Sequence, residues 1–453
     1  MSPECKGGES WKAVIAKEYA RRSGNEAPPI NTTFPLIASS IFSEEIIAAV
    51  DSVLNGQLTM SSNVREFEKE FARYVGAPFA VMCNSGSSAN LLALAAATNH
   101  ARSKNMHVGD EVLVPAVCWS TSLWPIVQMG LVPIFVDVNV STMNIDLDDV
   151  VTKITSKTRA VLAVHVLGNM CEMDRLMEIC KQHELFLIED TCESLGSTYR
   201  GKCVGTFGQF GTFSFYFSHH ITTGEGGMVV CQTQEDADLL RCLRAHGWTR
   251  ELSNKAILHE KYSSIDERFM FVNVGYNLRP MELSGAIGRC QLLRLPSMNH
   301  NRKENRERLI HALTSHHNWS GQLRFPNKPS EQADPAWFGF VAILARDFQH
   351  SLSSYLQFLT RHNIENRPII SGNFVRQPAI KSLGLKVDPQ GYTGADELGS
   401  CGFFIGVHTY SLSESQLKYL ADTMLAFDFK MQREKVVLVT GGTGMVGRAL
   451  GGD

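Results

Sequence analysis

The chain is 453 residues long, has a formal net charge of −3 at pH 7 with histidine neutral, and contains no long run of lysine or arginine. The length predicts two hydrophobic cores. The slightly negative net charge and the lack of a basic run argue against a positively charged surface that binds nucleic acid. Residues 1–10 are polar, and no apolar run reaches the roughly 18 residues that span a bilayer. We therefore expect a cytoplasmic protein that binds neither nucleic acid nor a membrane.

The eleven cysteines are scattered, and the nearest two in the sequence, Cys171 and Cys180, are nine residues apart. No two cysteines have the CxxC spacing that is typical of zinc knuckles, thioredoxin-like dithiols or clustered iron–sulfur motifs. We therefore expect reduced cytosolic thiols and no metal site.

The N-terminal residues 1–33 are predicted to form an arm or linker, with a short amphipathic stretch at residues 11–22 and a proline-containing break at 26–29. From residue 34 to 295, short β-rich runs alternate with helical segments, which predicts a large α/β domain. Most of the runs are continuously apolar, as expected for parallel strands that helices cover on both faces. The predicted strands are residues 79–83, 111–116, 132–138, 160–166, 185–190, 211–216 and 227–231.

A charged helical stretch at residues 301–314 and further mixed segments predict a smaller α+β domain over residues 296–430. Residues 431–453 fit neither domain, because a buried strand at 436–440 precedes the run GGTGMVG at 441–447. This order begins a dinucleotide-binding βαβ unit and resembles the N-terminus of extended short-chain reductases. Without a second strand, we expect a truncated stub with no cofactor affinity, left from a fusion of two enzymes of one pathway.

The first candidate site is the run NSGSSAN, from Asn84 to Asn90, between a predicted strand and a helical run. Small residues at such a turn expose backbone N–H groups at a helix N-terminus, where the helix dipole favours a phosphate. Gly86 and Ser87 are the predicted phosphate contacts. An ordinary serine-capped helix is the alternative interpretation.

Two acidic residues mark the end of the predicted strand at 185–190: Asp190 is its last residue, and Glu193 follows three residues later. In open α/β sheets, ligands bind at the carboxyl ends of the strands, so these carboxylates are predicted to face a ligand crevice. A helix N-cap is the alternative role for Asp190.

The most informative segment is SFYFSHHITTGEGG, from Ser214 to Gly227. It resembles the signature of the DegT-type sugar-nucleotide aminotransferases, in which a lysine of this segment binds pyridoxal 5'-phosphate (PLP) covalently. The resemblance implies the PLP-dependent transferase fold of type I, with a mainly parallel seven-stranded sheet sandwiched by helices and a smaller α+β domain. The position of the lysine holds His219 here. Histidine cannot form an imine, but its near-neutral pKa suits proton transfer, so His219 is the predicted catalytic base.

His220 is the alternative base, because tandem histidines allow an alignment error of one residue. Alignment of the following residues 221–227 with the family signature favours His219. A histidine in place of the lysine resembles the sugar 3-dehydratases of this family, one kind of which couples its cofactor to an iron–sulfur cluster. The segment LRAHGWTR at 243–250 lacks the close cysteine set of that kind, so we expect no cluster.

The resemblance to metal-free 3-dehydratases runs from about residue 34 to 429 and includes the segments VPAVCWST at 114–121, RAHGWTR at 244–250 and GYNLRP at 275–280. By this resemblance, Trp119 stacks on the cofactor ring, Asp190 pairs with the pyridinium nitrogen, and Ser214 binds the phosphate. Glu193 is a further predicted cofactor-binding residue. Asn277 reaches the phosphate of a neighbouring subunit, which implies a homodimer. The alternative roles are core packing for Trp119, a sheet edge for Ser214 and a helix cap for Asn277.

The implied activity is removal of the C3 hydroxyl from a nucleotide-linked 4-keto-6-deoxyhexose, which the resemblance alone specifies as GDP-4-keto-6-deoxymannose. Glutamate converts PLP into pyridoxamine 5'-phosphate, and His219 then removes a proton from the cofactor as the hydroxyl leaves. Two alternatives remain. A 4-aminotransferase of the same family would need the missing lysine, and a non-catalytic regulatory relative would not need Asp190 or Ser214.

Overall fold

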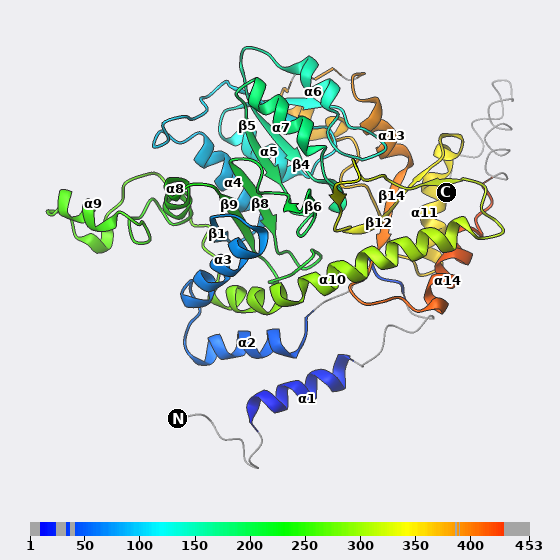
Figure 1. Cartoon of the computed structure of the whole chain (residues 1–453), viewed down its shortest axis with the longest axis horizontal. Coiled ribbons are helices and arrows are strands. Elements are labelled where there is room, and N and C mark those ends of the chain that lie inside the picture. The colour runs from blue at the N-terminus through cyan, green and yellow to red at the C-terminus, as the bar shows by residue number, and fades with distance from the viewer. Residues whose placement is uncertain (1–9, 24–32, 37–40, 386, 389, 430–453) are drawn as a thin grey trace.

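The computed structural model describes residues 10–23, 33–36, 41–385, 387–388 and 390–429 (Figure 1). The predicted reductase-like stub at 431–453, with its strand and glycine run, lies outside the described residues. No helix within the described part of the chain is long and apolar enough to cross a membrane.

A seven-stranded sheet forms the centre of the larger unit, in the order β1-β9-β8-β5-β4-β2-β3. Four neighbouring pairs, from β3 through β2, β4 and β5 to β8, are parallel, and β9 is antiparallel to both β8 and β1. The predicted sheet of seven mainly parallel strands is therefore confirmed. The ends of β1 and β9 are as predicted, and those of the other strands differ by at most two residues. The strands are β1 (Phe79–Cys83), β2 (Glu111–Pro115), β3 (Val132–Val136), β4 (Thr158–Val164), β5 (Phe186–Asp190), β8 (Phe210–Ser214) and β9 (Gly227–Cys231).

Helices cover both faces of this sheet, which explains why the middle parts of its strands are mostly apolar and do not alternate with polar residues. In β2, Val112 and Val114 belong to one hydrophobic core and Leu113 belongs to a second core on the opposite face. The first face packs against α4 (Gly86–Ala97), α5 (Ser120–Gln128) and α8 (Gln234–Arg244). The opposite face packs against α3 (Ser62–Val75), α6 (Leu147–Lys153), α7 (Met173–Gln182) and the start of α10 (Glu282–Thr314).

The smaller unit contains a four-stranded antiparallel sheet in the order β10-β12-β14-β13. Its strands are β10 (Leu323–Arg324), β12 (Gly339–Leu344), β13 (Asn366–Pro368) and β14 (Gly402–Gly406). Its helices are η3 (Arg346–Ser351), α11 (Leu352–Arg361), η4 (Phe374–Arg376), α12 (Pro378–Ser382), α13 (Thr393–Cys401) and α14 (Glu414–Met424). A third, small sheet joins β6 (Thr198–Tyr199) and β7 (Lys202–Cys203) of the larger unit to β11 (Ala333–Asp334).

Helix α10 connects the two units and continues unbroken through the predicted boundary between residues 295 and 296 (Figure 1). Pro296 lies inside this helix, although proline removes one backbone hydrogen bond from a helix interior. The division into residues 34–295 and 296–430 stays a prediction, and we propose that the two units share α10 as a common element.

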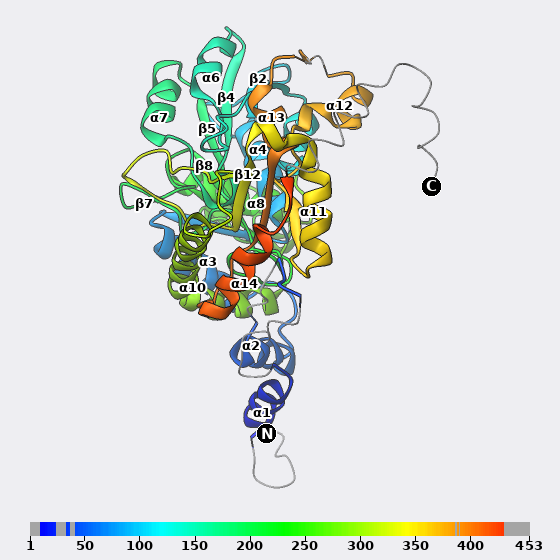
Figure 2. The ribbon, with the colours of Figure 1, turned by 90° about the vertical axis from the view of Figure 1, so that its right-hand side faces the viewer.

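Two helical segments extend from the body of the molecule. The predicted stretch at 11–22 forms α1 (Trp11–Ser23), which packs against α2 (Ser43–Leu54), and both lie below the rest of the molecule in two views (Figures 1 and 2). The hydroxyl of Tyr19 donates to the backbone oxygen of Ile41 over 2.6 Å. The second segment holds α9 (Lys255–Lys261) and η2 (Glu267–Phe269), and α9 projects to one side in Figure 1.

Candidate active site

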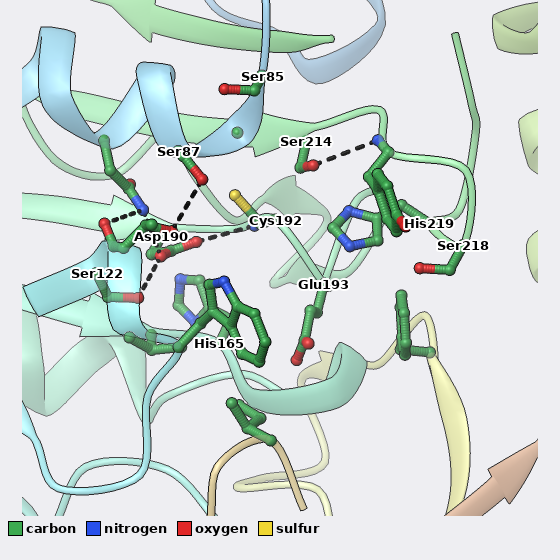
Figure 3. Close-up of a pocket in the computed structure, with 18 of the residues that line it drawn as sticks. Ser85, Ser87, Ser122, His165, Asp190, Cys192, Glu193, Ser214, Ser218 and His219 are labelled. Atoms are coloured by element: carbon green, nitrogen blue, oxygen red, sulfur yellow. Dashed lines mark hydrogen bonds between the residues drawn. The ribbon is translucent and has the colours of Figure 1, made fainter. Parts of the chain in front are cut away.

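A cavity of about 480 Å³ lies where the carboxyl ends of β5 and β8 meet the smaller unit (Figure 3). This is the position at which open α/β sheets bind ligands, because several strand ends and helix N-termini meet there. Seven of the eight predicted site residues line the cavity: Gly86, Ser87, Trp119, Asp190, Glu193, Ser214 and His219. The eighth, Asn277, lies outside it.

The predicted phosphate turn connects β1 to α4. Ser85 is the N-cap of α4, and its Oγ accepts the backbone N–H of Ser88 over 3.1 Å, so the serine-capped helix of the alternative interpretation is also present. Ser87 directs its hydroxyl toward Thr121 Oγ1, 3.2 Å away. Gly86 and Ser87 therefore occupy the first turn of a capped helix that faces the cavity, where the helix dipole favours an anion.

Gly86 leaves no space for a side chain, because a Cβ atom there would lie 2.5 Å from Ser214 Cβ and 2.8 Å from Ser214 Oγ. We expect Gly86→Ala to displace Ser214 and weaken cofactor binding about tenfold or more, since overpacking of this kind costs about 1–3 kcal/mol. Titration with PLP, followed by absorption, measures the effect. Gly399→Ala is the matched control, because a Cβ there meets only ordinary contacts at 3.4 Å and beyond. Equal affinity in both variants would contradict a phosphate contact at Gly86.

Asp190 lies buried at the end of β5 and is held by neutral donors. Its Oδ2 accepts hydrogen bonds from Asn90 Nδ2 over 2.8 Å and Ser122 Oγ over 2.7 Å, and its Oδ1 accepts the N–H of Cys192 over 3.2 Å. No cation among the described residues forms an ion pair with it, and no helix begins directly after it, which leaves the N-cap role unsupported. A buried carboxylate fixed in this way is suited to pair with a cationic group of a ligand.

Trp119 and Ser214 differ in exposure. Trp119 is the N-cap residue of α5, and its side chain is 58% exposed although it lines the cavity, so it is no part of the packed core. Ser214 is buried, ends β8, and accepts the N–H of Tyr216 at its Oγ over 3.3 Å. Because β8 lies between β5 and β9, Ser214 is not at a sheet edge. The exposed indole of Trp119 and the buried carboxylate of Asp190 line the same cavity, an arrangement that suits stacking of the indole on a flat heterocycle.

The two histidines point to different surroundings. His219 lines the cavity, its ring packs edge-on against Phe338 with centroids 5.3 Å apart, and its buried Nδ1 has no hydrogen-bond partner among the described residues. Burial lowers the pKa of His219 to about 4, against the opposing effects of a backbone hydrogen bond at Ser214 and the charge of Asp190. His220 instead directs Nε2 to the backbone oxygen of Ala336, 2.6 Å away. The geometry therefore favours His219 as the group that reaches a ligand.

Glu193 also lines the cavity, in the segment that follows β5. Its Oε2 accepts the backbone N–H of Leu167 over 3.1 Å, in η1 (Val166–Gly168). Burial raises the pKa of Glu193 to about 7, because the charged carboxylate is costly there; the hydrogen bond from Leu167 opposes this rise and the charge of Asp190 adds to it.

Several lining residues had not been predicted. Asn90 belongs to the quoted turn, one helical turn beyond Gly86, so its position on the same helix face was a usable signal. His165 lines the cavity from the end of β4, accepts the N–H of Cys171 at Nδ1 over 3.2 Å and bonds Glu189 through Nε2 over 3.2 Å. Arg367 of β13 and Phe338 come from the smaller unit, and nothing in the local sequence indicates that they reach this cavity.

Asn277 lines a different cavity, together with Trp248 and Arg250, and its Oδ1 accepts Arg279 Nε over 3.0 Å. It is not the cap of α10, whose N-cap residue is Met281. The next residue, Leu278, accepts the backbone N–H of Asn84 over 3.0 Å, beside the phosphate turn.

Comparison with known proteins decides the family. The model of the DegT/DnrJ/EryC1/StrS aminotransferase family matches residues 40–424. The chain belongs to this family. The predicted family is thereby confirmed, and so is the predicted PLP-dependent transferase fold of type I.

Within the DegT/DnrJ/EryC1/StrS family, the similar proteins include enzymes that are named 3-dehydratases. GDP-4-keto-6-deoxy-D-mannose 3-dehydratase of Yersinia pseudotuberculosis is 40% identical over 394 residues, which is 86% of this chain and 98% of that protein. The Escherichia coli enzyme of that name, solved with bound hydrated PLP, has a TM-score of 0.80 and 36% identity over 87% of this chain and 99% of that chain. Another structure of such an enzyme, with a trapped PLP–glutamate geminal diamine, has a TM-score of 0.79 and 36% identity over 86% of this chain and 100% of that chain.

The cavity of this family member fits PLP on three observations. A Cβ at Gly86 would fill the space beside Ser214, and one at Gly227 would lie 2.2 Å from the backbone oxygen of Ser85, so the backbone is closely packed around the phosphate turn. Asp190 is a buried carboxylate held without a cation, suited to a pyridinium nitrogen. The Nδ1 of His219 is buried without a partner among the described residues.

Proposed function

We propose that this chain is a PLP-dependent sugar-nucleotide 3-dehydratase, which removes the C3 hydroxyl of GDP-4-keto-6-deoxymannose with glutamate as the amino donor. One observation carries the proposal: His219 lines the cavity in the family's signature segment, and no lysine is among the described residues that line it. A side chain that cannot bind the cofactor covalently, but can move protons, favours elimination over amine transfer. The names of the similar enzymes support the substrate and the donor.

The residues of the chain have separate tasks in this proposal. Gly86, Ser87 and Ser214 bind the cofactor phosphate, Trp119 stacks on its ring, and Asp190 holds its ring nitrogen protonated. When bound, PLP would supply a carrier for the amino group of glutamate and an electron sink next to C4 of the sugar. His219, neutral at pH 7 because burial lowers its pKa to about 4, takes the proton from the cofactor's methylene carbon.

The test is incubation of the protein with PLP, glutamate and GDP-4-keto-6-deoxymannose, followed by mass analysis of the sugar. We expect a product that has lost the C3 oxygen, together with 2-oxoglutarate and ammonia. A product that keeps this oxygen and gains an amino group at C4 would show a 4-aminotransferase. If glutamate leaves the absorption of the cofactor unchanged, the chain is a regulatory relative and no enzyme.

We also propose a homodimer, in which Asn277 of each subunit reaches the cofactor phosphate of the other. Asn277 lies outside the cavity of its own subunit, yet its neighbour Leu278 bonds the phosphate turn at Asn84. The projecting segment and the chain between it and α10 carry exposed apolar side chains, as expected for a surface that a second copy covers. They are Ile257, Ile265, Phe269, Phe271, Val274 and Met281.

Subunit mixing tests this arrangement. We expect Asn277→Ala and His219→Asn to be nearly inactive alone, and mixtures of the two to regain activity, because a mixed dimer contains one site with both native residues. The two variants are mixed, briefly unfolded and refolded so that their subunits exchange, and the dehydration rate of the mixture is then measured. Activity that never exceeds the sum of the separate variants would contradict a shared site.

A further inference from the structure

Glu193 and His219 are two proton-carrying groups that line one cavity from different elements (Figure 3). Glu193 follows β5 and is anchored at Oε2 by the backbone N–H of Leu167. No hydrogen bond from the described residues reaches its other oxygen, Oε1, which leaves this oxygen available to a ligand. His219 follows β8 and packs against Phe338 of the smaller unit.

Burial reverses the usual order of acidity of these two groups. It lowers the pKa of His219 to about 4 and raises that of Glu193 to about 7, whereas an exposed histidine is the weaker acid of such a pair. Near neutral pH the imidazole is therefore a free base, and a large share of the carboxyl groups still carry a proton. Two groups whose surroundings separate their protonation states in this way are suited to opposite roles in one reaction.

Loss of a hydroxyl group needs both roles. A base must take a proton from carbon, and an acid must protonate the departing oxygen, because hydroxide is a poor leaving group. A neutral His219 has no proton to give before it has taken one, whereas a protonated Glu193 has one from the start. A separate acid therefore allows both transfers to occur in the same step.

Resting on the proposed 3-dehydratase function, we propose that Glu193 is the acid that protonates the departing C3 oxygen, while His219 acts only as the base. The C–H bond at the cofactor's methylene carbon breaks, and its proton goes to His219. The electron pair moves into the conjugated system, the C3–O bond breaks, and the oxygen leaves as water with the proton of Glu193. After this step His219 is an imidazolium and Glu193 is a carboxylate. Transfer of one proton from the imidazolium to the carboxylate returns both side chains to their starting protonation states.

Other titratable and charged groups surround Glu193 in the cavity and shape its titration. They are Asp190 and Cys192 of its own segment, His165 after β4, Tyr216, His219 and Glu225 of the segment between β8 and β9, and Arg367 of β13. The charge of Asp190 favours the protonated form of Glu193, and the hydrogen bond from Leu167 opposes it.

The leaving group provides the test in the wild-type protein. With GDP-4-keto-6-deoxymannose, we expect the dehydration rate to fall as pH rises through about 7, because Glu193 loses the proton that it must donate. With the 3-fluoro analogue, fluoride leaves without a proton, so this fall should be absent when fluoride release is measured. The same fall with both leaving groups would overturn the role of Glu193. Failure of the wild type to dehydrate the first substrate would instead contradict the proposed function.

Glu193→Gln keeps the size and polarity of the side chain but removes its proton. We expect dehydration to slow on the order of 10²-fold, and fluoride release from the analogue to stay close to the wild-type rate. Conversion of the cofactor by glutamate alone, followed by absorption, should also persist. Glu178→Gln, on the exposed face of α7, is the matched control. Equal losses for both leaving groups would reduce Glu193 to a binding contact and overturn the proposal.

An independent readout needs no turnover. Infrared difference spectra of the protein without sugar should contain a protonated-carboxyl band that disappears as pH rises through about 7. Glu193→Gln should lack this band, and Glu178→Gln should keep it. A wild-type spectrum without such a band near neutral pH would show that Glu193 has no proton to donate.

Discussion

His219→Asn is expected to lower the dehydration rate by about 10²–10⁴-fold while PLP still binds. Asparagine keeps a similar size and polarity but has no titratable group, so the contribution of a general base disappears. Asp190, Ser214 and the phosphate turn are untouched, and cofactor binding measured by absorption should stay near the wild-type value. Single-turnover assays with pre-formed pyridoxamine 5'-phosphate measure the loss directly.

His220→Asn is the matched control, because His220 bonds the backbone oxygen of Ala336 and does not line the cavity. Its loss of activity should be much smaller. The reverse result, with His220→Asn inactive and His219→Asn nearly normal, would assign the base to the second histidine. His219→Lys should bind the aldehyde of PLP covalently, colour the protein yellow, and abolish dehydration in favour of amine transfer.

The second large effect is on stability. We expect Arg244→Met to lower the free energy of unfolding by about 3–5 kcal/mol, because it leaves a buried carboxylate without its partner. Arg244 is 1% exposed; its Nη1 donates to Glu68 Oε1 over 2.6 Å and to the backbone oxygen of Met82 over 2.5 Å, and its Nη2 donates to Glu251 over 2.7 Å. Equilibrium unfolding in urea measures the change.

Two further variants separate the buried charge from the loss of a side chain. Adding Glu68→Gln to Arg244→Met should recover part of the stability, since glutamine removes the unpaired charge and can still accept the N–H of Met82. Arg268→Met breaks an exposed ion pair with Asp266 and should leave the urea midpoint almost unchanged. If Arg244→Met unfolds at the same urea concentration as Arg268→Met, the buried network does not stabilise the fold.

The cofactor half of the site was predictable because it depends on local chain geometry. A strand that passes through small residues into a helix places Gly86 and Ser87 at a helix N-terminus, whatever the rest of the fold does. A carboxylate at the end of a parallel strand faces the ligand crevice, and Asp190 ends β5. The continuous apolar runs predicted the parallel sheet for the same reason, since only strands covered on both faces need them.

Which groups meet across the cavity was not predictable from local patterns. The partners of Asp190, Asn90 and Ser122, are 100 and 68 residues away in the sequence, and Arg367 comes from another sheet. The first two contacts depend on how α4 and α5 pack on the larger sheet, and the position of Arg367 depends on how the two units pack. Hydrogen bonding across such distances leaves no periodic signal in the chain.

The sequence by itself determined the family and the positions of the seven strands along the chain, because these follow from residue identity and short-range spacing. Its resemblance to the family signature also indicated that His219 stands in place of a lysine. Only the tertiary structure decided that the ring of His219 lines the cavity while that of His220 bonds Ala336. Only the tertiary structure decided, too, that the surroundings of Glu193 raise its pKa to about 7. The physical reason is that a side chain's direction and its desolvation depend on everything packed around it, and residues distant in the sequence supply most of that surrounding.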